Sequence, residues 1–170
     1  MADTLSVTYT LNLSWSHVND LDLNDPADAG LFTFTDTLST GTAVDQANMI
    51  WHDQRTVSAG ANDDIDLAGS LTDGFGATIT FTKIKGIFVQ NTSTTVGDIL
   101  TIGEDGANGF VTWLNAAADK VKINPGGMFA LYDPSAAAYA VTASTGDILR
   151  ITETGSSNAV TYNIILIGTV

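Results

Sequence analysis

The strongest constraint on this chain is a period-two alternation of apolar and polar side chains near its N-terminus. Residues 4–16, TLSVTYTLNLSWS, place every apolar side chain on one side and Ser, Thr and Asn on the other. The apolar set is Leu5, Val7, Tyr9, Leu11, Leu13 and Trp15. This pattern predicts a β-strand about twice as long as the usual 5–6 residues. An uncharged strand without proline pairs readily at its edges. We therefore expect the edges of this strand to be covered, either by a neighbouring molecule or by flanking strands of its own sheet.

The rest of the chain shows shorter period-two segments separated by turn residues. An alternating segment at 77–90 changes phase between Phe81 and Ile84, which predicts a β-bulge or a corner near Thr82–Lys83. Other predicted strands are 49–57, 64–71, 98–103, 109–113, 119–123, 127–132, 139–143, 147–152 and 159–170. Strands spaced by about 8–12 residues are typical of sandwiches and barrels. The sequence therefore predicts an all-β fold, a jelly-roll-like antiparallel β-sandwich of about 8–10 strands.

A chain of 170 residues is most simply one domain. We expect residues 1–16 to form a long N-terminal strand or arm, residues 17–48 to be rich in loops, and residues 49–170 to form the sandwich. The segment 124–127, Asn-Pro-Gly-Gly, predicts a type II turn that joins 119–123 to 127–132 as a hairpin. The last strand is apolar on both faces at 164–167, which predicts a central strand covered on both sides.

Composition excludes several classes of function. The net charge of −13 argues against nucleic-acid binding, which needs a clustered positive surface. The absence of cysteine excludes disulfides, thiolate zinc sites and cysteine nucleophiles. There is neither a run of about 18 apolar residues nor a signal-peptide pattern at the N-terminus. We therefore expect synthesis in a cytoplasm and no membrane partner.

The candidate catalytic residues do not form a recognisable constellation. Of the two histidines, His17 and His52, only the second has an adjacent carboxylate, Asp53, and neighbouring residues of a strand point to opposite faces. The serines lack the nucleophile-elbow pattern. The carboxylates at 63, 64 and 66 crowd one turn, which favours a solvated loop over the paired acids of a glycosidase. The sequence predicts no enzyme and no catalytic residue.

Acidic loops at 24–30, 62–66 and 103–108 offer oxygen ligands that calcium accepts. None of them has the spacing of a known calcium loop, so metal-free turns are the default and calcium remains an open alternative. We predict no cofactor and no metal site.

A resemblance covers roughly residues 49–170. The order of its motifs is DQRT, DLAGSL, FGATITFTKIKGI, LTIG, GFVTW, VKINPGG and DILRIT, followed by a final apolar strand. This order resembles small virion structural proteins of tailed bacteriophages, of the type that decorates or cements the head. The resemblance implies a non-enzymatic protein on the outer capsid surface, docked on the major capsid protein and self-associated, with a homotrimer favoured and a dimer second. Residues 1–48 match nothing in that pattern.

An acidic protein should meet its partner through neutral and apolar surface, because buried unpaired carboxylates are costly. The expected interface is therefore either the N-terminal strand, through Leu5, Val7, Tyr9, Leu11, Leu13 and Trp15, or an aromatic patch at Phe110 and Trp113. The alternative function is a carbohydrate-binding β-sandwich module of a phage fibre or surface protein. A flat exposed row of aromatic side chains, drawn from Trp15, Trp51 and Trp113, would favour that alternative.

Overall fold

The computed structural model describes residues 4–103, 106–155 and 157–170, which contain β-strands and no helix. The all-β prediction is therefore confirmed. In chain order the strands are β1 (Val7–Val18), β2 (Ala27–Thr40), β3 (Gln46–Ala47), β4 (Met49–Val57), β5 (Asn62–Asp66), β6 (Ala68–Thr72), β7 (Thr78–Thr80), β8 (Lys83–Asn91), β9 (Leu100–Gly103), β10 (Lys120–Ile123), β11 (Met128–Tyr132), β12 (Tyr139–Ala140), β13 (Ile148–Glu153) and β14 (Val160–Thr169). Within these ranges no helix is long and apolar enough to span a membrane.

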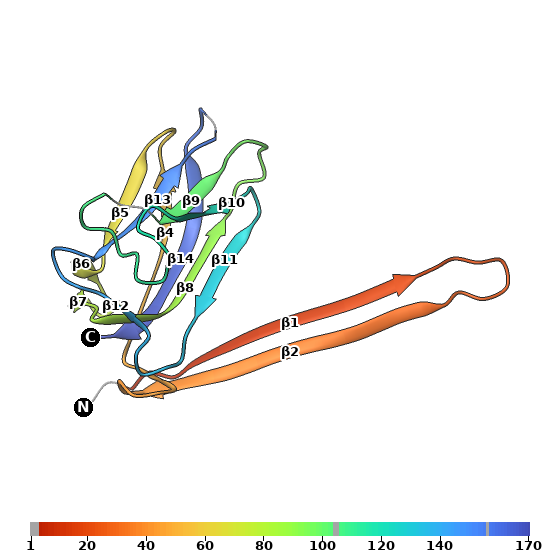
Figure 1. Cartoon of the computed structure of the whole chain (residues 1–170), viewed down its shortest axis with the longest axis horizontal. Coiled ribbons are helices and arrows are strands. Elements are labelled where there is room, and N and C mark those ends of the chain that lie inside the picture. The colour runs from red at the N-terminus through yellow and green to blue at the C-terminus, as the bar shows by residue number, and fades with distance from the viewer. Residues whose placement is uncertain (1–3, 104–105, 156) are drawn as a thin grey trace.

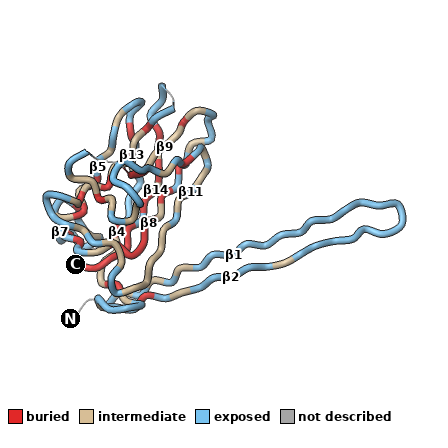
Figure 2. Tube along the Cα trace, viewed as in Figure 1, coloured by how far each residue is buried: buried red, intermediate tan, exposed pale blue. Residues whose placement is uncertain are grey.

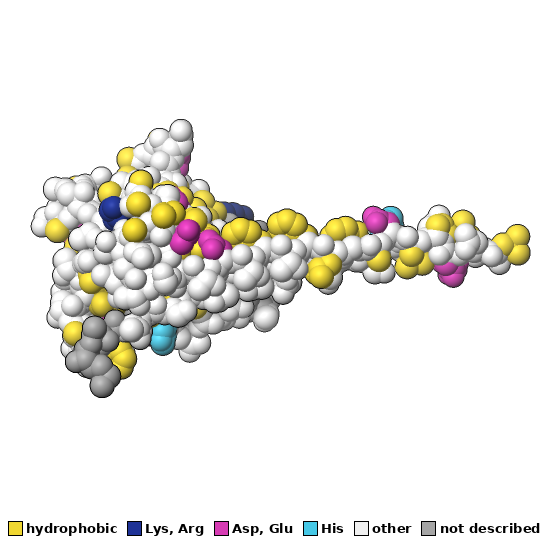
Figure 3. Space-filling view, turned by 90° about the horizontal axis from the view of Figure 1, so that it is seen from below, with side chains coloured by type: hydrophobic (Ala, Val, Ile, Leu, Met, Phe, Trp, Pro, Cys, Tyr) yellow, Lys and Arg dark blue, Asp and Glu magenta, His cyan; other side chains and the backbone are white. Residues whose placement is uncertain are grey.

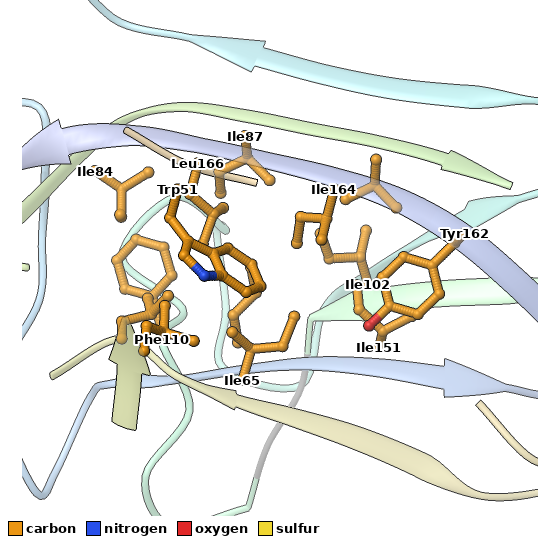
Figure 4. Packing of buried hydrophobic residues seen from close by; sticks show 14 of the residues in the cluster. Trp51, Ile65, Ile84, Ile87, Ile102, Phe110, Ile151, Tyr162, Ile164 and Leu166 are labelled. Carbon is orange, nitrogen blue, oxygen red and sulfur yellow. The ribbon is translucent and has the colours of Figure 1, made fainter. Parts of the chain in front are cut away.

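Two sheets form a sandwich-like body (Figure 1). One has the strand order β11-β8-β14-β4, with β12 also paired to β8, and the other has the order β10-β9-β13-β5. We call them the β8–β14 sheet and the β9–β13 sheet. Figure 4 shows the core between them, where alternate side chains of both sheets meet; labelled examples are Trp51, Ile164 and Leu166 from the first sheet and Ile65, Ile102 and Ile151 from the second.

The N-terminal segment forms an arm that projects from this body (Figure 1). Strands β1 and β2 pair antiparallel along their length, from Val7 opposite Leu38 to Val18 opposite Ala27. At about 3.3 Å per residue, the twelve residues of β1 span about 40 Å. We call residues 7–40 the arm. The predicted N-terminal strand is confirmed, and in the described part of the chain β2 is its sole strand partner, so it is not an internal strand of the sandwich.

The prediction that residues 17–48 are rich in loops was wrong for 27–40, which form β2. The alternation of Phe32 and Phe34 with threonines carried the signal for this strand. The acidic, glycine-containing start of the segment obscured it, because such residues usually mark turns.

The base of the arm is fixed to the body by a second, smaller apolar cluster. Leu38, Ala47 and Ile167 are buried there, and Leu5, Val7, Ile50, Phe88 and Tyr132 pack against them. Figure 2 shows that, within the arm, buried residues occur only at this base and most of the remaining length is exposed. The arm is therefore attached at one end and open to a partner along the rest.

Two local predictions in the body are confirmed, each with a correction. The Gly127 N–H donates to the Asn124 carbonyl oxygen (2.9 Å) and Gly126 has φ +71°, as a type II turn requires. However, the flanking strands β10 and β11 lie in different sheets, so they do not form a hairpin. Strand β14 is central, between β8 and β4, but the outer face of this strand is covered only in part, since Ile167 is buried at the arm base and Ile165 is 40% exposed.

The remaining strand predictions differ in detail. The phase change near Thr82–Lys83 is a corner, because β7 pairs with β6 whereas β8 enters the β8–β14 sheet. Segment 64–71 is divided between β5 and β6. Residues 109–113 form turns with one isolated bridge between Gly109 and Ile148, so that predicted strand was wrong.

Candidate interaction surface

One face of the arm is apolar and exposed. Residues directly opposite each other in an antiparallel pair share a face, and Leu11 lies opposite Phe34, Leu13 opposite Phe32, and Trp15 opposite Gly30. Leu13 is 59% exposed and Phe32 is 52% exposed. We call the set Tyr9, Leu11, Leu13, Trp15, Phe32 and Phe34 the apolar arm face. Figure 3 shows hydrophobic side chains along the arm from the body toward the tip.

Gly30 is required where Trp15 crosses the hairpin. A Cβ atom at Gly30 would collide with the indole ring of Trp15. Because Gly30 has no side chain, the indole of Trp15 lies across both strands. The apolar arm face thereby extends over β2 at this position.

The opposite face of β1 and β2 is mainly polar, with Leu31 opposite Ser14, and carries no charge. The hydroxyls of Thr8 and Thr37 lie 3.1 Å apart, and the Thr35 hydroxyl donates to that of Thr10 (3.4 Å). No Asp, Glu, Lys or Arg occurs in 7–16 or 29–35. Because a two-stranded hairpin alone is marginal in water, and a contiguous exposed apolar surface marks an interaction site, the arm is the leading candidate for a docking element.

An aromatic cluster sets the direction in which the arm leaves the body. The ring of Tyr9 stacks on that of Tyr132, with centroids 5.2 Å apart, and also contacts Phe34 (5.8 Å) and Phe88 (5.3 Å). The Tyr132 hydroxyl donates a hydrogen bond to the Asp36 carboxylate (2.8 Å). Burial, followed by this bond, raises the pKa of Tyr132 above its ordinary value. The hydroxyl therefore remains a donor at neutral pH.

The outer face of the β8–β14 sheet continues from the arm base as an uncharged surface. Strand register places two rows of residues across four strands. We call them the outer rows: His52, Ile165, Phe88 and Ala130 in the first, and Gln54, Asn163, Gln90 and Met128 in the second. The rows line a shallow groove of about 620 Å³. At edge strand β4 the groove is bordered by Asp53, whose carboxylate pairs with Arg55 (3.4 Å).

Side-chain amides link three strands within the second row. The Gln54 Nε2 group donates to Asn163 Oδ1 (3.0 Å), and Asn163 Nδ2 donates to Gln90 Oε1 (3.1 Å). These amides keep spare donors and acceptors at the surface. The groove thus combines apolar contact at Phe88 and Ile165 with neutral hydrogen-bonding groups.

The other predicted interface residues lie elsewhere. Leu5 and Val7 pack at the arm base within the chain itself. Phe110 is 1% exposed and belongs to the body core, so its place in an aromatic docking patch was wrong. Trp113 is half-buried, with its Nε1 donating to the Phe110 carbonyl (2.9 Å) and its ring against Phe129 (5.4 Å). Sequence reasoning missed Phe32 and Phe34, although their period-two spacing was visible.

The tryptophans do not form a flat stacking row. Trp51 is buried in the core, Trp113 packs inside the body surface and Trp15 lies on the arm. The sequence argument for a carbohydrate platform therefore has no counterpart in the described residues.

Titratable side chains show no metal-binding cluster within 4–103, 106–155 and 157–170, where no group of three or more His, Cys, Asp or Glu converges. The acidic loop at 103–108 lies partly outside the described residues. His52 faces outward opposite Ile165, whereas Asp53 lies opposite the core residue Ile164. The two neighbours therefore do not form a base-and-orienter pair.

The interpretation of 62–66 as a solvated acidic loop was wrong, because these residues form β5. The Asp63 carboxylate accepts hydrogen bonds from Arg55 Nε (2.7 Å), from Arg55 Nη2 (2.6 Å) and from the Tyr162 hydroxyl (2.7 Å). Burial alone would raise the pKa of Asp63, but these bonds and the charge of Arg55 outweigh it and hold that pKa below its ordinary value. This cluster therefore holds the Asp63 carboxylate in structural contacts that link β4, β5 and β14.

Comparison of the chain with protein-family models, with curated proteins and with solved structures finds no match. The apolar arm face and the outer rows are the two exposed surfaces that point to a function.

Proposed function

We propose that this protein is a non-enzymatic decoration (cement) protein of a tailed-phage head. The observation that carries the proposal is the projecting arm, whose strands are about 40 Å long at 3.3 Å per residue and carry no charged residue in 7–16 or 29–35. A body of about 130 residues has a radius of gyration of about 14 Å, and so a diameter of about 35 Å. The arm is therefore as long as the body is wide. Beyond its anchored base it leaves its own body, so a neighbouring molecule has to supply its contacts.

The strand order supports the jelly-roll-like part of the proposal. The two sheets have the orders β4-β14-β8-β11 and β5-β13-β9-β10. Successive strands β4 and β5, β8 and β9, β10 and β11, and β13 and β14 alternate between the two sheets. Such paired crossing between two sheets, each with four strands in order and β12 added beside β8, is the arrangement expected of a double-sheet jelly roll.

The proposed mechanism is linkage by mass action. A protein that binds the assembled lattice of the major capsid protein better than it binds free subunits shifts the equilibrium toward assembly. Its contacts would use neutral and apolar surface, and its many carboxylates would face water. The site of action would be the outer capsid surface, after synthesis in the host cytoplasm. The resemblance adds the expectation of a homotrimer, with a dimer second.

The test uses virions from the genome that encodes this chain. Mass spectrometry of purified particles is expected to find the chain in stoichiometric amounts. Heads that lack the protein should be disrupted at a lower temperature than heads to which the full-length chain has been added back. Absence of the chain from virions would contradict the proposal. Equal disruption temperatures would show that it attaches without cementing.

A further inference from the structure

We propose that the apolar arm face of one copy packs on the outer rows of a second copy. The chain would thereby form a closed homo-oligomer by exchanging arms. The proposed function already expects self-association; this inference goes beyond it by naming the two surfaces that meet, and it holds whether or not a phage head is present.

The chain already makes this kind of contact with itself at the arm base. Register places a further row directly beside the outer rows, made of Ile50, Ile167, Gly86 and Tyr132. Val7 and Leu38 of the arm, with Leu5 just before it, belong to the cluster that covers Ile167 and Tyr132. In the next row Phe88 still contacts Tyr9 of the arm, whereas Ile165 is 40% exposed. A second arm lying on the outer rows would extend the packing that ends at this boundary.

The aromatic cluster at the base joins the two surfaces. Tyr9 and Phe34 belong to the apolar arm face and contact Phe88 and Tyr132 of the body. Phe88 is itself a member of the first outer row. The beginning of the apolar arm face and the outer rows therefore border the same open angle between arm and body (Figure 1), and this angle is where a neighbouring copy is received.

Charge favours a second copy as the occupant. The chain has a net charge of −13, so two copies repel each other unless their contact excludes carboxylates. The residues named for the apolar arm face and the outer rows include no Asp, Glu, Lys or Arg. The neighbouring carboxylates have partners within the chain, since Asp36, opposite Tyr9, accepts from the Tyr132 hydroxyl, and Asp53 at the groove edge pairs with Arg55. The two surfaces also complement each other chemically, since leucine and aromatic side chains on the arm meet Phe88, Ile165 and Met128. A strongly cationic partner would seek the acidic surfaces instead.

Buried area favours a closed exchange over a single contact. From Tyr9 to Trp15 the apolar arm face is about 23 Å long, and two strands about 4.8 Å apart make it about 10 Å wide. One such contact buries roughly 500 Å² on the two partners together, below the ~1,000 Å² of a stable interface. In a closed oligomer every copy gives one arm and receives one, which doubles the buried area for each copy.

The first test measures oligomeric state without any capsid protein. Light scattering coupled to size-exclusion chromatography is expected to find the full-length chain as a dimer or trimer. The double substitution Leu13→Ser with Phe32→Ser should shift it to monomer, and so should Ile165→Asp on the outer face. The matched control is Leu31→Ser, which removes a leucine that is 66% exposed on the other face of the arm and should leave the oligomer intact. Circular dichroism verifies that each variant is folded.

The second test uses the absence of cysteine from the natural chain. Copies carrying Leu13→Cys are mixed with copies carrying Ile165→Cys and treated with a short bismaleimide. Crosslinks between the two kinds of chain are expected, whereas Leu31→Cys mixed with Ile165→Cys should give few.

Three results would overturn the inference: a wild-type chain that stays monomeric at high micromolar concentration, oligomers that survive both arm substitutions, or equal crosslinking by Leu13→Cys and Leu31→Cys. If the chain stays monomeric and its arm is needed only for binding to heads, the arm binds the capsid protein and not a second copy. That result would overturn this inference and leave the proposed function standing. Arm-dependent oligomers in a chain absent from virions would contradict the proposed function alone.

Discussion

At the scale of single residues, the strongest polar cluster of the body is structural. Asp63 links Arg55 of β4 to Tyr162 of β14, two strands that are neighbours in one sheet, while it belongs to β5 of the other. The Tyr162 side chain is buried, and burial, followed by its bond to Asp63, raises its pKa. The cluster therefore fastens the two sheets together at one edge.

We predict that Asp63→Asn lowers the free energy of unfolding by about 2 kcal/mol at pH 7, because charge-assisted hydrogen bonds to a shielded carboxylate are lost. For a chain of this size the melting temperature should fall by about 4–8 °C. The folded-state pKa of Asp63 lies below the unfolded value of about 3.9. Its contribution is thus complete above pH 4 and disappears as the pH falls through the folded-state pKa.

Thermal unfolding at a series of pH values checks this prediction. The difference between wild type and variant should shrink on acidification below about pH 4. The control is Asp64→Asn, whose carboxylate also pairs with an arginine, Arg150 (2.6 Å), but is far more exposed. Its loss should cost at most about 1 kcal/mol. Equal losses for the two variants would contradict the account given for Asp63.

At the scale of elements, the arm and the body are joined through few side chains. Tyr132 supplies both the ring that stacks on Tyr9 and the hydroxyl that binds Asp36. The exposed length of β1 has no other layer packed on it in the described chain, so the stability of the arm depends on this anchor more than the body does.

We predict that Tyr132→Ala loosens the arm while the body keeps its structure. Loss of an aromatic contact and a hydrogen bond, each about 1 kcal/mol, should speed hydrogen exchange in β1 by roughly tenfold or more. Exchange at Ile164 and Leu166 in the body core should change little. Tyr132→Phe, which keeps the ring, should show a smaller effect. Equal acceleration in arm and body would mean that the two unfold as one unit.

At the scale of the whole molecule, a net charge of −13 opposes any association between copies. The faces proposed to meet are uncharged, so salt screens the repulsion without weakening the contact itself. Raising the ionic strength from 0.01 M to 1 M shortens the Debye length from about 30 Å to about 3 Å.

We therefore predict that self-association tightens several-fold as sodium chloride is raised over this range, measured by sedimentation equilibrium. The Ile165→Asp variant should stay monomeric throughout. Weakening of association by salt would indicate ion pairs across the interface, which the apolar arm face and the outer rows cannot supply.

The sequence by itself located most of the strands, because alternation with period two is a local property. It located β4 at its observed bounds, β1 and β14 to within a few residues, and the corner before β8. It also located the type II turn at 124–127, since proline and glycine restrict the backbone there.

Only the tertiary structure decided how these strands are partnered and covered. The same turn can close a hairpin or carry the chain between sheets, and here it separates β10 from β11. The same alternation describes an apolar face turned to a core, as at Ile164, and one turned outward, as at Leu13. Pairing and burial depend on segments distant in the sequence, which a local pattern does not encode. For this reason the strand at 4–16 was predictable, whereas its pairing with β2 and the exposure of its apolar face were not.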